Sequence, residues 1–252
     1  HVFHDDLLPM NKSWFAEFTR QYSRRVRKPF EMNCHPNLMD KDIAIMAKSA
    51  GCALIRFGIE SGNEHIRRDI LDRSVTDRRI GDAFRCCDDV DIKTLSYNMI
   101  GLPHETRKQI LDTIKLNAAV RAEVVHVSIF YPYPGTSAFE RCRQEGLLTD
   151  KYIDSYYEDS VLEQPCISTE QVRAMKERFE PLVRSYSRCR EVPAPLDKLG
   201  EKLIDLGVLA ATDRRVLKMK GKLSRKKAPG ERISGGNCYV VHGGEVRVWE
   251  KK

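Results

Sequence analysis

The chain has 252 residues, of which 41% are hydrophobic and 31% charged, a balance typical of a folded globular protein rather than a disordered one. This length allows one large core, or a core with a small appendage. Because no apolar run approaches the ~20 residues that cross a bilayer, we expect no membrane partner. The eight cysteines are scattered without a C-x-x-C pair, and we expect reduced, buried thiols in a cytoplasmic protein.

The net charge of +7 is unevenly placed. From residue 214 to residue 252 there are 12 Lys or Arg against 3 Asp or Glu, whereas the part before it is nearly neutral. A basic tail of this kind can attract nucleic acid or an acidic partner. A solvated extension is the commoner explanation, and the tail lacks the interleaved aromatic residues of a base-stacking surface.

Strands and helices alternate through the first 131 residues. Strands are expected where apolar residues alternate or run together, and helices where they recur at a spacing of three and four. Short loops between them predict parallel strands joined by right-handed crossovers. The expected strands cover residues 1–6, 30–35, 53–63, 93–100 and 123–131, and the expected helices 12–27, 40–50, 64–70, 76–89 and 106–120.

Each expected strand has one apolar parity and one polar parity. Side chains alternate between the two faces of a strand, so we expect the apolar parity under the helices and the polar parity around a shared interior. An ordinary eight-stranded barrel fills its interior with branched apolar side chains. The pattern here instead predicts an open, ligand-holding lumen. The polar parity consists of Asp5, Glu31, Asn33, His35, Arg56, Glu60, Ser96, Asn98, His126 and Ser128.

The stretch 53–63 places an arginine and a carboxylate on that polar parity. A salt bridge between Arg56 and Glu60 is one explanation for two charges in a buried strand. Gly58 and Gly62 flank the carboxylate, and their missing side chains would let a ligand approach the backbone closely. Ligand sites of α/β proteins lie at the carboxyl ends of such strands. Both interpretations stay open.

After residue 135 the strands give way to helices. A pair of prolines, Pro193 and Pro195, marks a boundary, and a basic stretch leads to a hairpin whose turn contains two glycines. The expected elements are helices over 137–146, 168–190 and 196–206, a linker over 218–232 and a hairpin over 237–249. The resulting parts are a barrel over 1–150, a helical extension over 151–195 and a small basic segment over 196–252.

Four motifs lie at the ends of successive strands: Asp5-Asp6, Gly58-Ile-Glu-Ser-Gly62, Asn98-Met-Ile-Gly-Leu-Pro-His-Glu105 and Tyr131-Pro-Tyr-Pro-Gly-Thr136. Together they resemble the core of radical S-adenosylmethionine (SAM) enzymes, and most of all the branch that often carries an N-terminal cobalamin-binding domain. The resemblance implies an α/β fold, a partial (β/α)6 TIM-like barrel made of strands two to six. It also implies a [4Fe-4S] cluster at which SAM is reductively cleaved, giving a 5′-deoxyadenosyl radical that acts on a substrate, here unknown.

Cofactor contacts follow from the resemblance by position, whereas no catalytic residue does. A carboxylate can accept hydrogen bonds from an ammonium group or a ribose, and glycine lets a ring approach the backbone. The expected contacts are Asp5 and Asp6 near the methionine moiety, Asn33 on the next strand, Glu60 and Ser61 at the polar groups or ribose hydroxyls, Asn98, Ile100 and Gly101 along the adenosine, and Phe130 and Tyr131 beside the adenine.

The cluster ligands are the part of the resemblance that this sequence lacks. The family's C-x3-C-x2-C motif follows the first barrel strand, and no three cysteines here have that spacing. We therefore expect the ligands in an N-terminal segment or domain outside this chain, which could also hold cobalamin, and we expect the chain alone to be inactive. The alternatives are a non-catalytic barrel remnant and a nucleic-acid-binding module that uses the basic tail. We expect His35, His104 and His126 to be structural residues rather than metal ligands.

Overall fold

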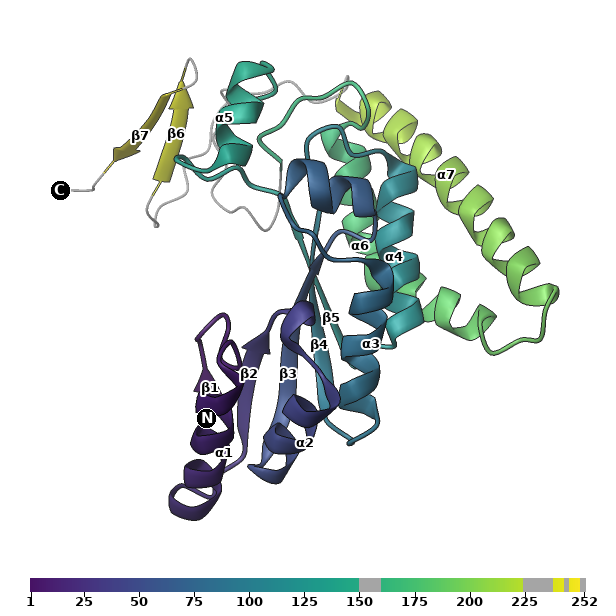
Figure 1. Cartoon of the computed structure of the whole chain (residues 1–252). Helices are drawn as coiled ribbons and strands as arrows, with labels where there is room; N and C mark the ends of the chain where they lie inside the picture. The colour runs from purple at the N-terminus through teal and green to yellow at the C-terminus, as the bar shows by residue number, and fades with distance from the viewer. Residues whose placement is uncertain (150–159, 224–237, 243–244, 250–252) are drawn as a thin grey trace.

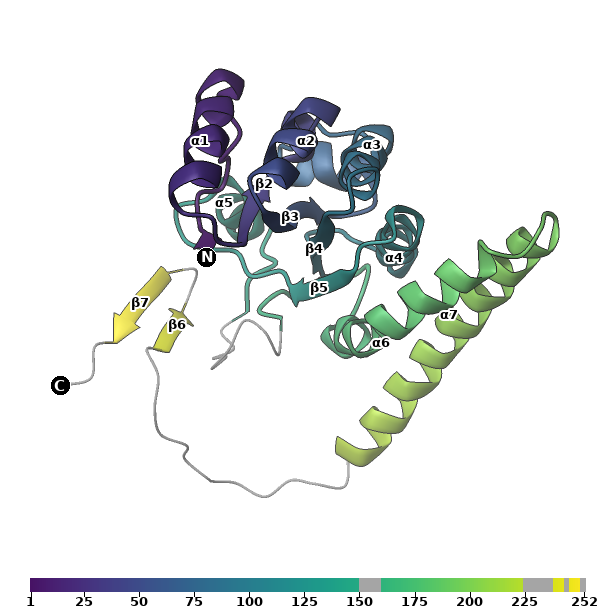
Figure 2. The same cartoon turned by 90° about the horizontal axis from the view of Figure 1, so that it is seen from below.

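A computed structural model describes residues 1–149, 160–223, 238–242 and 245–249. Five parallel strands form one sheet, in which the order β1-β2-β3-β4-β5 is also the order in the chain. The strands form an arc whose convex side carries helices α1 to α4 (Figures 1 and 2). The elements of this layer are β1 Val2–Phe3, α1 Lys12–Arg25, β2 Phe30–Cys34, α2 Lys41–Ser49, β3 Cys52–Glu60, α3 Asp77–Asp88, β4 Lys93–Ile100, α4 Arg107–Val120 and β5 Val124–Ile129.

Each of these helices begins at a side chain that accepts a hydrogen bond from the first turn. Asn11 accepts from the Trp14 amide at 2.9 Å at the start of α1. Asp40 does the same for α2, and Thr76 for α3. Thr106 and Gln109 form a reciprocal capping box at α4. Such caps satisfy amide groups that the first turn leaves without partners, so strand ends and helix starts are locally encoded.

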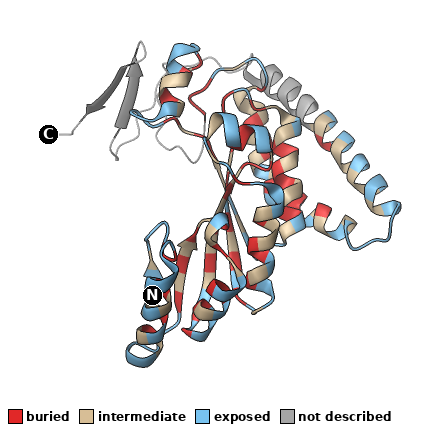
Figure 3. Cartoon of the chain, viewed as in Figure 1, coloured by how far each residue is buried: buried red, intermediate tan, exposed pale blue. Residues whose placement is uncertain are grey.

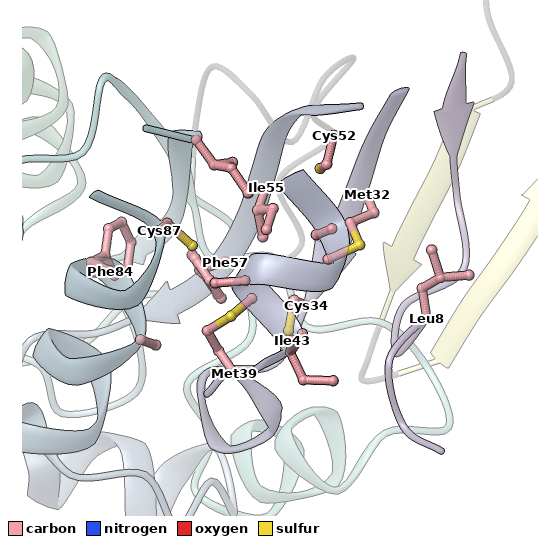
Figure 4. Packing of buried hydrophobic residues seen from close by; sticks show 14 of the residues in the cluster. Leu8, Met32, Cys34, Met39, Ile43, Cys52, Ile55, Phe57, Phe84 and Cys87 are labelled. Atoms are coloured by element: carbon pink, nitrogen blue, oxygen red, sulfur yellow. The ribbon is translucent and has the colours of Figure 1, made fainter. Parts of the chain in front are cut away.

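The main core lies between β2, β3 and the helices that cover them. Met32 and Cys34 of β2 and Ile55 and Phe57 of β3 are all buried there, as Figure 4 shows. Phe84 of α3 packs on Phe57 with ring centroids 4.9 Å apart. For these two strands the apolar parity faces the helices, as the sequence predicts, so the opposite parity faces the concave side of the arc.

The faces of β4 are reversed relative to the prediction. Ser96 and Asn98 lie under α4, where the Ser96 hydroxyl and the Asn117 amide oxygen are 2.6 Å apart and Asn117 donates to the Asn98 oxygen at 2.7 Å. Both are essentially unexposed. Tyr97, on the other parity, is 39% exposed on the concave side. Buried polar groups are tolerated when they are hydrogen-bonded, and Asn117 supplies those bonds.

Two further helices complete the described fold around β5. Helix α6 (Thr169–Cys189) packs on α4 and β5, and α7 (Leu196–Leu223) packs on α6. A short helix α5 (Ser137–Gln144) follows β5. Helix α7 runs past the expected end at residue 206 and into the expected linker. The hairpin of β6 (Cys238–His242) and β7 (Glu245–Trp249) is antiparallel as expected, although its turn lies outside the described residues.

The division of the chain near residues 150 and 195 stays a prediction.

None of the helices within the described residues has the length and apolar character that a membrane span requires.

Candidate functional site

The carboxyl ends of the five strands meet along one edge of the sheet because the strands are parallel. Four stretches from the sequence motifs lie there: Asp5 and Asp6 after β1, Glu60 at the end of β3, Gly101 after β4, and Phe130-Tyr131 after β5. The edge therefore brings the four motifs together. The individual side chains differ, however, in whether they face the concave side, the helices or solvent.

Glu60 ends β3 in a strained conformation that directs its carboxylate back over the strand. Its φ is +64°, in the left-handed region that non-glycine residues seldom occupy. A Cβ added to Gly58 would lie 2.2 Å from the Glu60 Oε1 atom, so the missing side chain makes room for the carboxylate itself. The glycine space that the sequence analysis assigned to a ligand is filled by the protein's own acid.

Within the described residues, the Glu60 carboxylate has one ion-pair partner. Arg73 Nη1 donates to it at 3.3 Å, and Arg73 Nη2 donates to the Gly58 carbonyl oxygen at 3.0 Å. Burial raises the pKa of Glu60, and the charge of Arg73 opposes that shift. The Nε atom of Arg73 is buried and has no hydrogen-bond acceptor among the described residues. This pair therefore keeps capacity for a further polar group.

The salt bridge between Arg56 and Glu60 does not form. Arg56 instead pairs with Glu31 on the adjacent strand β2. Residues four apart on one strand are separated by ~13 Å at about 3.3 Å per residue, whereas neighbouring strands lie about 4.8 Å apart. Arg56 can therefore reach a carboxylate on the neighbouring strand but not one four residues away on its own strand. Glu60 pairs with Arg73 instead.

The residues after Glu60 build a scaffold rather than a ligand surface. Ser61 is fully buried, and its hydroxyl accepts from the Asn63 amide at 3.2 Å. A Cβ on Gly62 would lie 2.3 Å from the Thr113 Cα atom, so this glycine permits close contact with α4. Arg67 is unexposed and donates to the carbonyl oxygens of Ser61 and Val75 at 2.6 and 2.9 Å. The predicted contact from the Ser61 side chain is not supported by this position.

Two of the contacts predicted on β4 face the helices. The Asn98 side chain is bonded to Ser96 and Asn117, and Ile100 is buried in the core beneath α4 and α6. The concave face beside Glu60 is formed by Gly58, Tyr97 and His126, of which Tyr97 belongs to the parity that was expected under the helices. Tyr97 lies between Gly58 and His126 in the strand register, and its ring meets the His126 ring edge-on at 5.5 Å.

The turn after β4 is fixed by a carboxylate that the sequence analysis left without a role. Glu105 is fully buried, and its Oε2 atom accepts from the amides of Gly101 at 2.6 Å and Leu102 at 3.2 Å. Burial raises its pKa to about 8. The Gln164 amide also donates to the Gly101 and Leu102 carbonyl oxygens. In the sequence, the only signal for this role of Glu105 is a glycine four residues before it. That glycine, Gly101, has a φ of +78° in the structure.

The remaining predicted contacts lie around the edge. Asp5 and Asp6 are exposed, and the Asp5 carboxylate accepts from the Leu7 amide at 2.9 Å. Asn33 is half-buried and lies beside Arg56 on the concave face. Phe130 is buried, and the Tyr131 ring meets the ring of Tyr133 at 5.1 Å. The binding of SAM by these residues stays a prediction.

Cysteines of the described residues do not fit a [4Fe-4S] cluster. Cluster ligands must be thiolates, whereas burial raises the pKa of Cys34 and Cys52 to about 12 and that of Cys142 to about 11. Across the described ranges no group of three His, Cys, Asp or Glu side chains is placed to hold a metal ion. His35 instead accepts from the Asn37 amide, and His104 lies 2.5 Å from Glu145.

A cleft of about 820 Å³ lies on the helix side, between α3 and α4. Several of its charged lining residues already have partners: Lys93 pairs with Glu123, and Lys115 with Asp205. It lies apart from the concave face that Glu60 and Tyr97 share. We therefore assign the candidate site to the carboxyl edge and the concave face.

The family comparison agrees with this geometry. The model of the radical SAM superfamily matches residues 5–116, a span that begins at Asp5 and includes Glu60 and Glu105. Residues 5–116 are therefore similar to the radical SAM superfamily. The parallel arc of α/β units is accordingly the partial barrel predicted from the sequence.

Two curated relatives match a somewhat larger share of the chain than the family model does. An uncharacterized methyltransferase of Pyrococcus horikoshii is 26% identical over 147 residues, covering 58% of this chain and 32% of that protein. The anaerobic magnesium-protoporphyrin IX monomethyl ester cyclase of Cereibacter sphaeroides is 24% identical over 149 residues, covering 57% and 24%. The chain thus spans a third or less of the length of these relatives.

A solved structure shows the same fold. Coproporphyrinogen III oxidase from Escherichia coli, described as a radical SAM enzyme, superposes with a TM-score of 0.50 at 15% identity, covering 69% of this chain and 37% of that one.

Proposed function

We propose that the carboxyl edge of β1 to β5 binds SAM, and that the whole protein uses it to start radical chemistry on a substrate held against the concave face. The observation that carries this proposal is Glu60. Its carboxylate lies at the end of a central strand of the sheet, at a left-handed φ, and Arg73 is its ion-pair partner. Backbone strain of this kind costs about 1–3 kcal/mol and persists mainly at functional sites.

The residues at this edge fit the polar groups of SAM. The Glu60 carboxylate can accept from a ribose hydroxyl or from an ammonium group. The buried Arg73 Nε atom lacks an acceptor within the described part of the chain, and a ligand oxygen would supply one. The aromatic pair Tyr131 and Tyr133 would border the adenine. When bound and reduced in this family, SAM supplies a 5′-deoxyadenosyl radical.

The described residues supply no cluster ligands, so no step of the cluster chemistry is assigned to them. Cobalamin use also stays a prediction. The two curated relatives carry different named reactions, methyl transfer and cyclisation. The proposal therefore extends to SAM binding and radical initiation, and leaves the reaction outcome open.

Calorimetric titration with S-adenosylhomocysteine tests the SAM site. A few hydrogen bonds, each contributing about 0.5–1.5 kcal/mol, predict a dissociation constant on the order of 1 mM, which corresponds to about −4 kcal/mol. Glu60→Gln should weaken binding at least threefold. The matched control is Glu123→Gln, which removes an exposed carboxylate before β5 at the opposite edge of the sheet.

Equal affinity in the wild-type chain and Glu60→Gln would contradict the assignment of Glu60. Loss of affinity in Glu123→Gln would indicate a site elsewhere. Micromolar affinity would contradict the expectation that the ligand's strongest anchor lies outside this chain.

A further inference from the structure

Helix α7 is apolar on two opposite faces. On one face Ile204 and Val208 pack into the core formed with α6, and Val208 is 2% exposed. The opposite face carries four leucines whose side chains remain open to solvent. This leucine stripe consists of Leu196, Leu199, Leu203 and Leu206, which are 59%, 53%, 61% and 59% exposed.

Nothing in the described part of the chain covers the leucine stripe. Helix α7 lies on the outer side of α6, away from the sheet, in both views (Figures 1 and 2), and the described part of α7 is largely exposed or intermediate along its length (Figure 3). Scattered exposed leucines are normal on a protein surface, whereas a contiguous apolar stripe marks an interaction site. A helix that is apolar on both sides is typical of one buried between two neighbours.

The spacing of the leucines indicates what kind of neighbour fits. They follow one another at intervals of three, four and three residues, which is the a/d spacing of a helical seam. These intervals read the same in both directions. A second identical helix running antiparallel, about a two-fold axis near residue 201, would place Leu196 against Leu206 and Leu199 against Leu203.

We propose that a second copy of this chain covers the leucine stripe, in an antiparallel pair of α7 helices. Two-fold pairs of this kind are self-complementary, since each copy offers the same patch. Gly207 borders the stripe, and a Cβ added there would meet no atom within 4 Å. The absence of a side chain at that position leaves room for a helix to approach closely.

Charge favours the antiparallel arrangement over a parallel one. Residues 207–223 carry five Lys or Arg and one Asp, a net charge of +4 in this half of α7. Parallel helices would place two such halves side by side, where like charges repel. The antiparallel pair, centred near residue 201, directs them away from each other.

The contact is short, so the pair should be weak and reversible. Overlap of the stripes over residues 196–206 spans ~16 Å of helix. A stable interface buries about 1,200–2,000 Å², more than two four-leucine stripes supply. We therefore expect half of the chains to be paired at a chain concentration on the order of 100 µM.

Sedimentation velocity of the whole chain from 5 to 500 µM measures the association. The wild-type chain should shift from monomer to dimer, and Leu203→Glu should weaken association at least tenfold. Leu203 is exposed, so this change leaves the core intact. Lys198→Gln is the control, because it lowers the net charge by the same one unit at an exposed position beside the stripe. It should associate like wild type.

A monomer at every concentration, or unchanged dimerisation of Leu203→Glu, would overturn the proposal. Raising salt from 50 to 500 mM should change the dissociation constant less than twofold; pronounced tightening would indicate parallel helices and overturn the antiparallel arrangement. Sedimentation with anionic vesicles tests whether a membrane surface covers the leucine stripe. Vesicle binding that Leu203→Glu abolishes, in a chain that stays monomeric without lipid, would show that a membrane surface covers the stripe instead.

Discussion

Two buried carboxylates lie at the same edge of the sheet in different surroundings. Glu105 is fully buried, and one of its oxygens accepts two backbone amides of the turn after β4. Glu60 is directed over the concave face, where Arg73 is its ion-pair partner at 3.3 Å. Both belong to motifs by which the sequence resembles radical SAM enzymes. The partners of each carboxylate distinguish the acid that shapes the backbone from the acid that is available to a ligand.

The backbone conformations of the two regions differ in which residue is left-handed. After β4, Gly101 adopts a left-handed conformation without steric penalty, and His104 in the same turn has a φ of +61°. At the end of β3 the left-handed position is Glu60 itself, which costs free energy. At the end of β3 the left-handed residue is thus the acid itself, whereas after β4 the left-handed residues are neighbours of Glu105.

Removal of the Glu105 side chain should have the largest effect. Glu105→Ala leaves two buried amides without acceptors, and each unsatisfied group costs about 1–3 kcal/mol. We expect a loss of about 3 kcal/mol in the free energy of unfolding, measured by urea denaturation. Glu105→Gln keeps an acceptor oxygen and should lose less than half as much. Equal losses in both variants would mean that the hydrogen bonds of the turn are not what stabilises it.

Alanine substitution of the two glycines beside Glu60 should lower the free energy of unfolding by different amounts. The change at Gly62 should have the second-largest effect. In Gly62→Ala the new Cβ would lie 2.3–2.5 Å from backbone atoms of Asp112 and Thr113, which cannot move without shifting α4. Overpacking of this kind costs typically 1–3 kcal/mol, and we expect about 2 kcal/mol by urea denaturation.

The matched change is Gly58→Ala, whose Cβ meets mainly the end of the flexible Glu60 side chain. It should cost less than 1 kcal/mol of stability and yet displace the carboxylate, so that it reproduces the loss of ligand affinity in Glu60→Gln. A larger stability loss in Gly58→Ala than in Gly62→Ala would contradict this assignment.

The pH dependence of stability should distinguish the carboxylates further. Burial raises the pKa of Glu105 in the folded chain to about 8, above its ordinary value of 4.5. Between these values the folded state binds more protons than the unfolded state, so the contribution of Glu105 is full below pH 4.5 and is lost as pH rises through 8. We expect the wild-type chain to lose on the order of 3 kcal/mol between pH 5.5 and pH 8, at about 1.36 kcal/mol per pKa unit, and Glu105→Gln to lose less. Identical slopes would contradict the raised pKa.

Local signals in the sequence were sufficient for the elements and for their order. Asn11, Asp40 and Thr106 begin helices as side-chain chemistry predicts. Which face of β4 lies under the helices could not be predicted from local signals. Leu95, Tyr97 and Met99 make the more apolar face, yet Asn117 on a distant stretch of chain satisfies the polar face and places it under α4.

The site was predictable in outline and not in its side chains. The motifs marked the correct edge of the sheet, because strand ends are visible in the sequence. The partner of Arg56 depends on strand register, and the role of Gly62 depends on the approach of α4. Both are tertiary facts that residue spacing within one strand does not contain.

The most direct test compares how a ligand stabilises two variants. Saturating S-adenosylhomocysteine should raise the urea midpoint of the wild-type chain and of Glu105→Gln by the same amount, since a ligand that binds only the folded state stabilises it. Glu60→Gln should unfold within about 0.5 kcal/mol of wild type without ligand and gain little from its addition. If instead the ligand stabilises Glu60→Gln fully and fails to stabilise Glu105→Gln, then Glu105 belongs to the ligand site, and the assignment of the two carboxylates is reversed.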